Sequence, residues 1–275
     1  MLSLASGGSS NEAILGFRSI VQLSWALTIR KVAQLQAELI RQRQADPVSS
    51  SLQSPNDIDI SDEQLANIAI DNGALEFLRL IIDLPECEPL WTRRLHGLIT
   101  DLIVLLPMRV REIRLRDEEL ARRTGMDPSA DGRGFANLLL LIGDIYSSDQ
   151  SSTGFGNPHT ARLTLSYWWS AGSLLDSQTD AAVHASVEAI PNQSRLVEVD
   201  RLRQSALFRF VRSASDFVSS SCLYVPYLHM LRGLVCTQRA ADLCFKLLSV
   251  NASGAGKLFE CLKQYTRRKR CLFAK

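Results

Sequence analysis

Apolar side chains recur along this chain with the period of an α-helix. Segment 207–218 is one example, with its apolar residues on one face: Leu207, Phe210, Val211, Ala214, Phe217 and Val218. Segments 135–145 and 240–248 repeat the pattern. Successive helical residues are rotated by about 100°, so side chains three and four positions apart share a face. No comparable alternating stretch indicates a β-sheet, and the sequence therefore predicts an all-α fold.

Several residues mark predicted helix boundaries. Ser61 and Gln64 have the spacing of a capping box, in which each side chain bonds a free backbone N–H of the first turn. Pro107 follows the apolar run 98–106, so one helix is predicted to end there and another to begin. Pro226 is predicted to lie in a first turn for the same reason.

The predicted helix that follows Pro107 is heavily charged. Between residues 108 and 123 it carries both arginines and carboxylates, including the consecutive pair Glu118 and Glu119. We expect this helix to be solvated on most of its circumference. Consecutive carboxylates on a helix point in different directions, so this pair does not predict an acid/base couple.

The segments between the helical patterns predict an irregular α-solenoid, a superhelical stack of helix pairs without a strict sequence repeat. Polar stretches predict three flexible loops, near residues 45–56, 126–134 and 147–157. We expect a flexible N-terminus over 1–12, a single solenoid segment over 13–256 with a weakly ordered connection at about 171–199, and a divergent basic tail over 257–275.

Charge and composition exclude several classes of function. The 31 Lys and Arg residues against 29 Asp and Glu give a net charge of +2, so no overall field favours nucleic acid or an acidic membrane. The longest apolar run, 102–106, is far shorter than the ~20 residues that span a bilayer. No secretory signal is visible at the N-terminus. The six scattered cysteines contain no Cys-x-x-Cys pair, which favours reduced thiols in the cytosol or nucleus.

One glycine-rich stretch resembles a phosphate-binding loop but departs from its pattern. Residues 254–257 read Gly-Ala-Gly-Lys, yet Asn251 stands where the first glycine is needed and Leu258 stands where Ser or Thr is needed. A helix C-cap or a turn between helices is the better interpretation.

The residue types of enzyme and metal sites are present without their spacing. The histidines are far apart in the sequence: His96, His159, His184 and His229. No Cys/His cluster has metal-ligand spacing, and no nucleophile motif occurs. We therefore predict no catalytic, cofactor-binding or metal-binding residue, no small-molecule substrate and no enzyme activity.

Two further features have competing interpretations. The run Arg267–Arg270 is either a nuclear-localisation or RNA-contacting patch or, as we favour, the solvated end of a helix. The consecutive rings Tyr167, Trp168 and Trp169 cannot all face one core, so at least one should contact a neighbouring helix pair or a partner. Burial in the core remains the more frequent role for such rings.

Four segments together resemble a known family. In chain order they span residues 20–30, 94–110, 138–146 and 224–234, and they read IVQLSWALTIR, RLHGLITDLIVLLPMRV, LLLLIGDIY and YVPYLHMLRGL. They are similar to the amino-terminal part of the large inner-ring scaffold nucleoporins, the nucleoporin 205 and nucleoporin 192 family. Segments 61–66 and 244–251 also look like that family. Each string alone is an ordinary amphipathic helix, but their shared order across most of 14–251 is specific.

The resemblance implies a structural component of the nuclear pore complex in the nucleus. It implies an α-helical solenoid that docks short linker segments of other inner-ring nucleoporins, without catalytic residues. The near-neutral charge predicts no direct nucleic-acid partner. Members of the family are several times longer, so the chain is expected to be a fragment, a truncated gene model or a shortened isoform. An alternative with the same fold is a soluble transport receptor or adaptor that binds protein partners reversibly.

Overall fold

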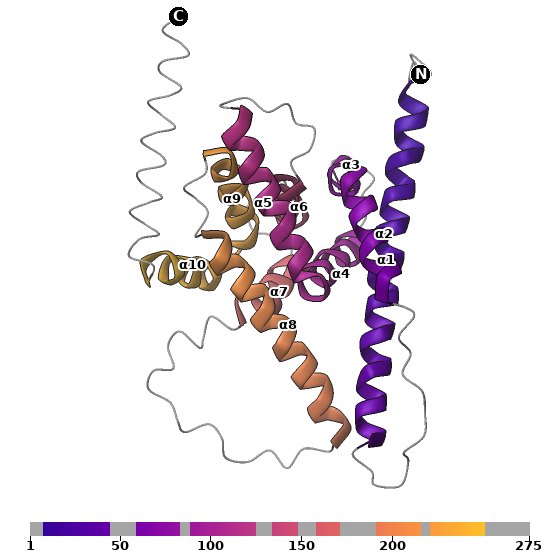
Figure 1. Ribbon diagram of the computed structural model, residues 1–275. Helices are drawn as coiled ribbons and strands as arrows, with labels where there is room; N and C mark the ends of the chain where they lie inside the picture. Colours follow the sequence, from indigo (N-terminus) through magenta and orange to yellow (C-terminus); the bar gives the residue numbers. More distant parts are fainter. Residues whose placement is uncertain are drawn as a thin grey trace, which may run out of the picture.

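The computed structural model describes the chain over residues 8–44, 59–82, 89–124, 134–147, 158–170, 191–215 and 221–250. In these ranges every element is a helix and no strand is present, which confirms the predicted all-α class (Figure 1). The elements in chain order are α1 Gly8–Gln44, α2 Asp59–Asp71, α3 Ala74–Ile82, α4 Pro89–Leu105, α5 Pro107–Thr124, α6 Gly134–Ser147, α7 Pro158–Leu163, the π-helical turn η1 Thr164–Trp168, α8 Pro191–Ser215, α9 Ser221–Leu234 and α10 Gln238–Val250.

The three predicted loops fall almost entirely outside the described residues. All of 45–56 lies there, and so do most of 126–134 and 147–157. The exceptions are Gly134, which begins α6, and Ser147, which ends it.

Two helices extend into segments for which the sequence predicted little order. Helix α1 begins at Gly8, inside the N-terminal segment 1–12. Helix α8 begins at Pro191 and takes up the last part of the predicted connection 171–199. The proline suits a helix start because its fixed φ matches the helix. It also loses no hydrogen bond there, since an N–H at the first helical position has no partner within the helix. The tail 257–275 lies outside the described residues.

Pro107 divides two helices as predicted. Helix α4 ends at Leu105 and α5 begins at Pro107. The neighbouring backbone bonds continue across the junction, since Leu106 N donates to Leu102 O and Val110 N to Leu106 O, each at 3.1 Å. The proline therefore bends the path of the chain without leaving these adjacent groups unpaired.

Two other boundary predictions are wrong by a few residues. Helix α2 begins at Asp59, so Ser61 lies inside the helix rather than at its N-cap. Helix α9 begins at Ser221, and Pro226 lies inside it, beyond the first turn. Only the first four N–H groups of a helix lack an internal partner, so Pro226 leaves the carbonyl four residues earlier without its usual donor.

Helix α5 is less solvated than its charge predicted. Arg109 and Asp117 are only 2% and 3% exposed. Asp117 Oδ2 accepts bonds from Phe135 N at 3.0 Å and Ala136 N at 2.9 Å, so it caps the N-terminus of α6. Arg109 donates to Asp71 at 2.9 Å. Charged side chains tolerate burial when they are paired in this way, and the periodicity of α5 alone does not reveal these partners.

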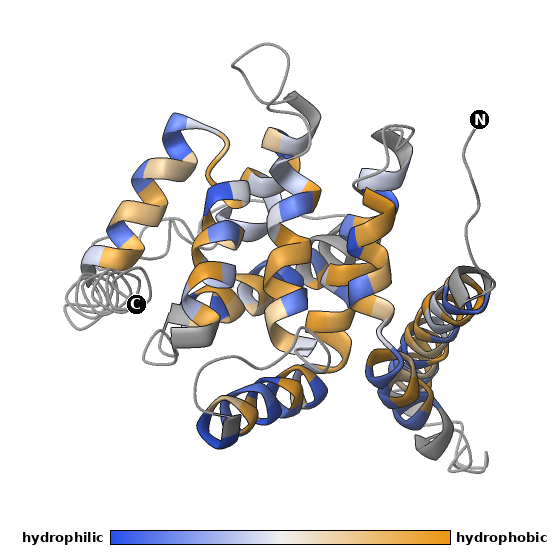
Figure 2. Ribbon diagram, turned by 90° about the horizontal axis from the view of Figure 1, so that it is seen from above, coloured by the Kyte–Doolittle hydropathy of each residue, from blue (hydrophilic) through white to orange (hydrophobic). Residues whose placement is uncertain are grey.

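Helix α6 lies at the centre of the fold and contacts α3, α4, α5 and α9. Its buried residues are Phe135, Ala136, Leu138, Leu139, Leu141, Ile142, Gly143, Ile145 and Tyr146. They include every apolar residue of the predicted face in 135–145, and burial extends beyond that face. Figure 2 shows the hydrophobic centre of the molecule, with polar residues concentrated toward the outside of the surrounding helices. A helix that is apolar on nearly all sides is one that other helices surround.

Two glycines allow α6 and α9 to cross with their backbones in contact. A methyl group at Gly143 would lie 2.7 Å from the carbonyl oxygen of His229, and one at Gly233 would lie 2.9 Å from Gly143 Cα. These distances are shorter than van der Waals contact, and a backbone atom blocks the methyl group at each position, joined at Gly143 by the ring of His229. Only glycine fits at this crossing.

A buried polar network joins three helical segments beside this crossing. Trp168 Nε1 donates to Tyr146 Oη at 2.7 Å, and the same oxygen lies 2.6 Å from His96 Nδ1. Burial raises the pKa of Tyr146 above its ordinary range, so the phenol stays protonated. Trp169 Nε1 instead donates to Leu234 O at 3.0 Å. Both tryptophans are buried, at 0% and 1% exposure, which confirms the core role and explains how consecutive rings face different neighbours.

A second network connects α3, α6 and α9 through one carboxylate. Asp144 accepts from Arg79 Nε at 2.9 Å and lies 2.5 Å from His229 Nε2. Burial raises the pKa of Asp144, but the hydrogen bonds and charges of His229 and Arg79 together outweigh it, so the pKa lies below the ordinary 3.8. The ionised carboxylate therefore stabilises the packing of the three helices.

We predict that Gly143→Ala destabilises the chain by more than about 2 kcal/mol, because the methyl group forces the α6 and α9 backbones apart. The matched control is Gly97→Ala in α4, where an added methyl group meets nothing within 4 Å. That control should stabilise the chain by up to about 1 kcal/mol, since alanine has the higher helix propensity. Urea unfolding followed by circular dichroism measures both, and equal effects of the two substitutions would contradict the close crossing.

We also predict that Asp144→Asn lowers the free energy of unfolding at pH 7 by about 1–3 kcal/mol, through the loss of charge-assisted hydrogen bonds. Because the folded-state pKa of Asp144 is lowered, its contribution is complete above about pH 4 and is lost as the pH falls through the folded-state pKa. The difference between wild type and variant should therefore shrink toward pH 3 in denaturant titrations. Asp200→Asn, on an exposed part of α8, is the control and should change little at either pH.

Candidate docking surface

Helix α1 is fixed to the rest of the molecule by one face. Leu23, Ala26 and Leu27 on this face are at most 3% exposed, and the helix contacts α2, α3 and α4. At Gly16 an added methyl group would lie 2.8 Å from Phe77 Cδ1, so the α1 backbone lies directly against the ring of Phe77. This inner face accounts for the attachment of α1.

Ion pairs fix the rotation of α1 about its own axis. Arg30 Nη1 lies 3.4 Å from the buried carboxylate of Asp62 in α2. Lys31 Nζ lies 3.2 Å from Asp101 Oδ2 in α4. Together with the buried inner face, these contacts leave the opposite side of α1 directed away from the core.

The opposite side of α1 carries a second row of apolar residues, which we call the outer stripe. Its members recur at helical spacing along most of the helix and are between 47% and 63% exposed. They are Ile14, Phe17, Val21, Trp25, Val32, Leu35 and Leu39. Single exposed apolar residues are normal on a protein surface, but a contiguous row marks an interaction surface.

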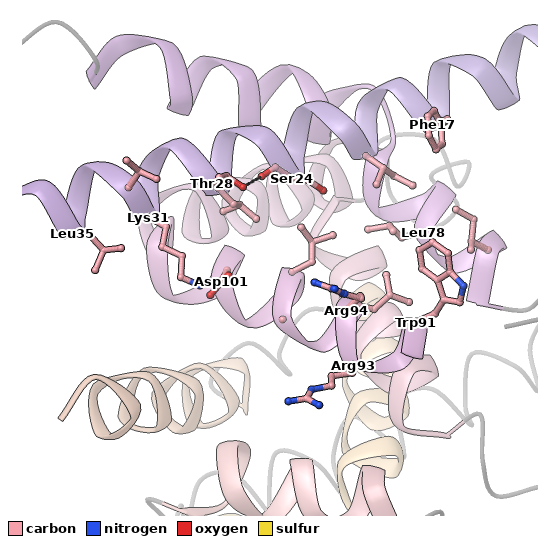
Figure 3. Close-up of a pocket in the computed structure, with 17 residues that line it drawn as sticks. Phe17, Ser24, Thr28, Lys31, Leu35, Leu78, Trp91, Arg93, Arg94 and Asp101 are labelled. Atoms are coloured by element: carbon pink, nitrogen blue, oxygen red, sulfur yellow. Dashed lines mark hydrogen bonds and ion pairs between the residues drawn. The ribbon is translucent and has the colours of Figure 1, made fainter. Parts of the chain in front are cut away.

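The outer stripe borders a groove of about 820 Å³ between α1 on one side and α3 and α4 on the other. Most of its lining is apolar: Phe17, Ile20, Leu27, Val32, Leu35, Leu78, Ile81, Trp91, Leu95 and Leu98. Figure 3 shows Trp91 near Leu78, with Ser24 and Thr28 of α1 on the other side of the groove. Trp91 is 54% exposed, so its indole is available to a binding partner.

The charged residues that line the groove are mostly basic. They are Lys31, Arg93, Arg94 and Asp101. Asp101 pairs with Lys31 and also with Arg203 of α8, so its charge is neutralised. Arg93 and Arg94 are exposed, and no ion pair joins either one to another described residue. The groove therefore presents an apolar floor and two arginines without a carboxylate partner in the described part of the chain.

The structure does not assemble the other residues considered from the sequence into a chemical site. No cluster of three metal-ligating side chains occurs among the described residues. His229 pairs with Asp144, and His96 contacts Tyr146, so both take part in the packing of helices. Cys236 and Cys244 are free thiols, and burial raises the pKa of Cys244 to about 11, which disfavours the reactive thiolate.

Several sequence candidates cannot be placed. The stretch 254–257 and the basic run Arg267–Arg270 lie outside the described residues, as does His184. The side chain of His159 is likewise not described. The predicted absence of catalytic, cofactor and metal residues remains a prediction for the whole chain.

Sequence reasoning missed the outer stripe. The signal is visible in the sequence, because Phe17, Val21 and Trp25 recur at helical spacing and Val32, Leu35 and Leu39 continue the row. However, α1 is apolar on two opposite sides, and the sequence does not tell which side is buried. Only the packing of α1 on α2, α3 and α4 settles that question.

Comparison with known proteins relates the chain to the nuclear pore. Residues 82–268 match the family described as nuclear pore complex scaffold, nucleoporins 186/192/205. Nuclear pore complex protein Nup205 of Homo sapiens is 31% identical over 248 residues, which cover 86% of this chain and 11% of the human protein. Nup205 of Drosophila melanogaster is 26% identical over 205 residues, covering 71% of this chain and 8% of that protein. No solved structure matches the chain.

The chain thus spans about a tenth of the length of these relatives. None of its described helices is long and apolar enough to cross a membrane. The family match covers more than half of the chain and includes the α4 side of the groove, and the human relative extends the similarity over most of the remainder. The chain therefore belongs to the nucleoporin 186/192/205 family of nuclear pore complex scaffold proteins.

Proposed function

We propose that this chain is a structural segment of the nuclear pore complex inner ring, resident at the nuclear envelope, where it docks short segments of other nucleoporins. In this role it supports the organisation of the pore and hence nucleocytoplasmic transport. The observation that carries the proposal is the groove beside α1, an uncovered apolar surface on a helical body. Membership of a scaffold family supports it.

We further propose that residues 13–256 act as one solenoid segment without enzyme activity. A connected series of packed helices among the described residues supports this, since α1 contacts α3, α3 contacts α6 and α6 contacts α9. The buried polar groups of this series serve packing, as the networks of Tyr146 and Asp144 illustrate. A rigid body of this kind suits a scaffold because docked partners then keep fixed relative positions.

A soluble transport receptor with the same fold is the alternative. It would also present grooves for peptide segments, but it would exchange between nucleus and cytoplasm. The similarity to nuclear pore complex proteins favours the scaffold. Residence time at the pore distinguishes the two functions, because a scaffold exchanges slowly and a receptor exchanges quickly.

We predict that the chain, fused to a fluorescent protein and expressed in cells, gives a nuclear rim that recovers slowly after photobleaching. Asp200→Asn, on an exposed part of α8 outside the groove, should behave like wild type, whereas Gly143→Ala should lose the rim because its helices no longer pack. Rapid recovery, with the chain shuttling between nucleus and cytoplasm, would favour the receptor. A diffuse signal from a folded chain would contradict scaffold function for this segment.

A further inference from the structure

We infer that the groove between α1 and α4 binds an amphipathic helix of another protein, and that acidic residues border the apolar stripe of that helix. The inference rests on the proposed function, because it specifies the chemistry of a partner that a scaffold segment would dock. It goes beyond the family relation, which names no partner for this groove. Three properties of the surface support it: its shape, its apolar residues and its charge.

The shape of the surface favours a helix over an extended strand. In the described part of the chain both walls of the groove are α-helices, whose backbone N–H and C=O groups already bond one another. A partner strand that pairs through its backbone needs a free strand edge, and no strand occurs in this part. The partner must therefore bind through side chains, as a helix does when it lies in a groove between two others.

The apolar residues have the spacing that such a partner requires. Phe17 and Leu35, which mark the two ends of the α1 side of the groove, are separated by five helical turns, or about 27 Å. Phe17 is 63% and Leu35 is 60% exposed, so a partner would bury apolar surface of both side chains. Trp91 on α4 adds an exposed indole on the opposite wall, and tryptophan is frequently an energetic anchor of interfaces.

The charges select the kind of helix. Arg93 and Arg94 are exposed at the groove without an ion-pair partner among the described residues. The single carboxylate among the described lining residues, Asp101, forms ion pairs with Lys31 and Arg203. Acidic residues beside the partner's apolar stripe would pair with these arginines. Complementary charge of this kind chiefly sets orientation and specificity.

The same charges argue against a second copy of this chain. Helix α1 itself carries five basic residues and two acidic ones, Arg18, Arg30, Lys31, Arg41, Arg43, Glu12 and Glu38. An α1 helix seated in the groove of another copy would thus bring further positive charge toward Arg93 and Arg94. A lipid surface also fits poorly, because a flat bilayer would meet the rim of a concave groove and leave its floor uncovered.

The test uses the complete chain and two synthetic helical peptides of about 21 residues, labelled with a fluorophore. Both carry leucine at the a and d positions of a heptad. One has glutamate and the other has lysine at the flanking positions. We expect the glutamate peptide to bind in fluorescence anisotropy, with an affinity that falls as salt rises, and the lysine peptide to bind at least about tenfold more weakly.

Matched variants locate the binding site. Arg93→Glu with Arg94→Glu should weaken binding of the glutamate peptide by about tenfold or more. Arg122→Glu with Arg123→Glu makes the same change of charge on exposed residues of α5 outside the groove, and should have little effect. Phe17→Ala should weaken binding by about tenfold. Phe245→Ala removes an equally large exposed ring on α10, which does not line the groove, and serves as its control. Circular dichroism confirms that each variant is folded.

Several outcomes would overturn the inference. Equal binding of the two peptides would contradict the requirement for acidic residues. Failure of the glutamate peptide to bind would contradict the proposal that the groove binds an amphipathic helix. A stoichiometric dimer that depends on Phe17 and excludes the peptide would identify a second copy as the occupant. Binding to vesicles containing phosphatidylserine, without binding to either peptide, would identify a membrane.

The inference and the proposed scaffold function can fail separately. A chain that stays at the nuclear rim but does not bind the glutamate peptide would overturn the assignment of this groove alone. A chain that binds the peptide through Arg93 and Arg94 but recovers rapidly after photobleaching would overturn scaffold residence alone.

Discussion

The close crossing of α6 and α9 is the constraint on which the rest of the structure depends. Because Gly143 and Gly233 have no side chains, the two backbones touch, and this approach brings His229 of α9 within hydrogen-bond distance of Asp144 of α6. Arg79 of α3 bonds the same carboxylate, so the orientation of α3 follows from the crossing. Helix α1 then packs on α3. The position of the groove is thus set by contacts that begin at two glycines.

Helical periodicity made the fold class and much of the core predictable, because burial follows the apolar face. In α6 every residue of the predicted face is buried. Pro107 separates two helices because it has no N–H to donate to the preceding turn. Burial of charge was not predictable in this way. Asp117 appears in the sequence as part of a solvated helix, yet its carboxylate caps α6. A tertiary hydrogen bond of this kind joins residues that no local pattern relates.

The groove was less predictable than the fold, for a related physical reason. Helix α1 has apolar residues on opposite sides, and hydrophobicity alone gives both sides an equal tendency to be buried. The choice depends on which side can approach other helices closely. Gly16 allows the backbone of α1 to contact Phe77, and Arg30 reaches Asp62 on the same side. Once that side is occupied, the outer stripe is exposed, so the docking surface is a consequence of tertiary packing.

The C-terminal part of α1 depends on the outer stripe for its stability in an assembly. Between residues 28 and 40 no residue of this helix is fully buried, although the helix continues past Leu27 to Gln44. Beyond the pairs made by Arg30 and Lys31, the continuation carries Val32, Leu35 and Leu39 in exposed positions. A helical extension with little buried surface is only marginally stable in water. A partner that covers these side chains would stabilise the extension in proportion to the apolar area removed from water. The same residues that expose apolar surface in the isolated chain are therefore those through which an assembly would stabilise α1.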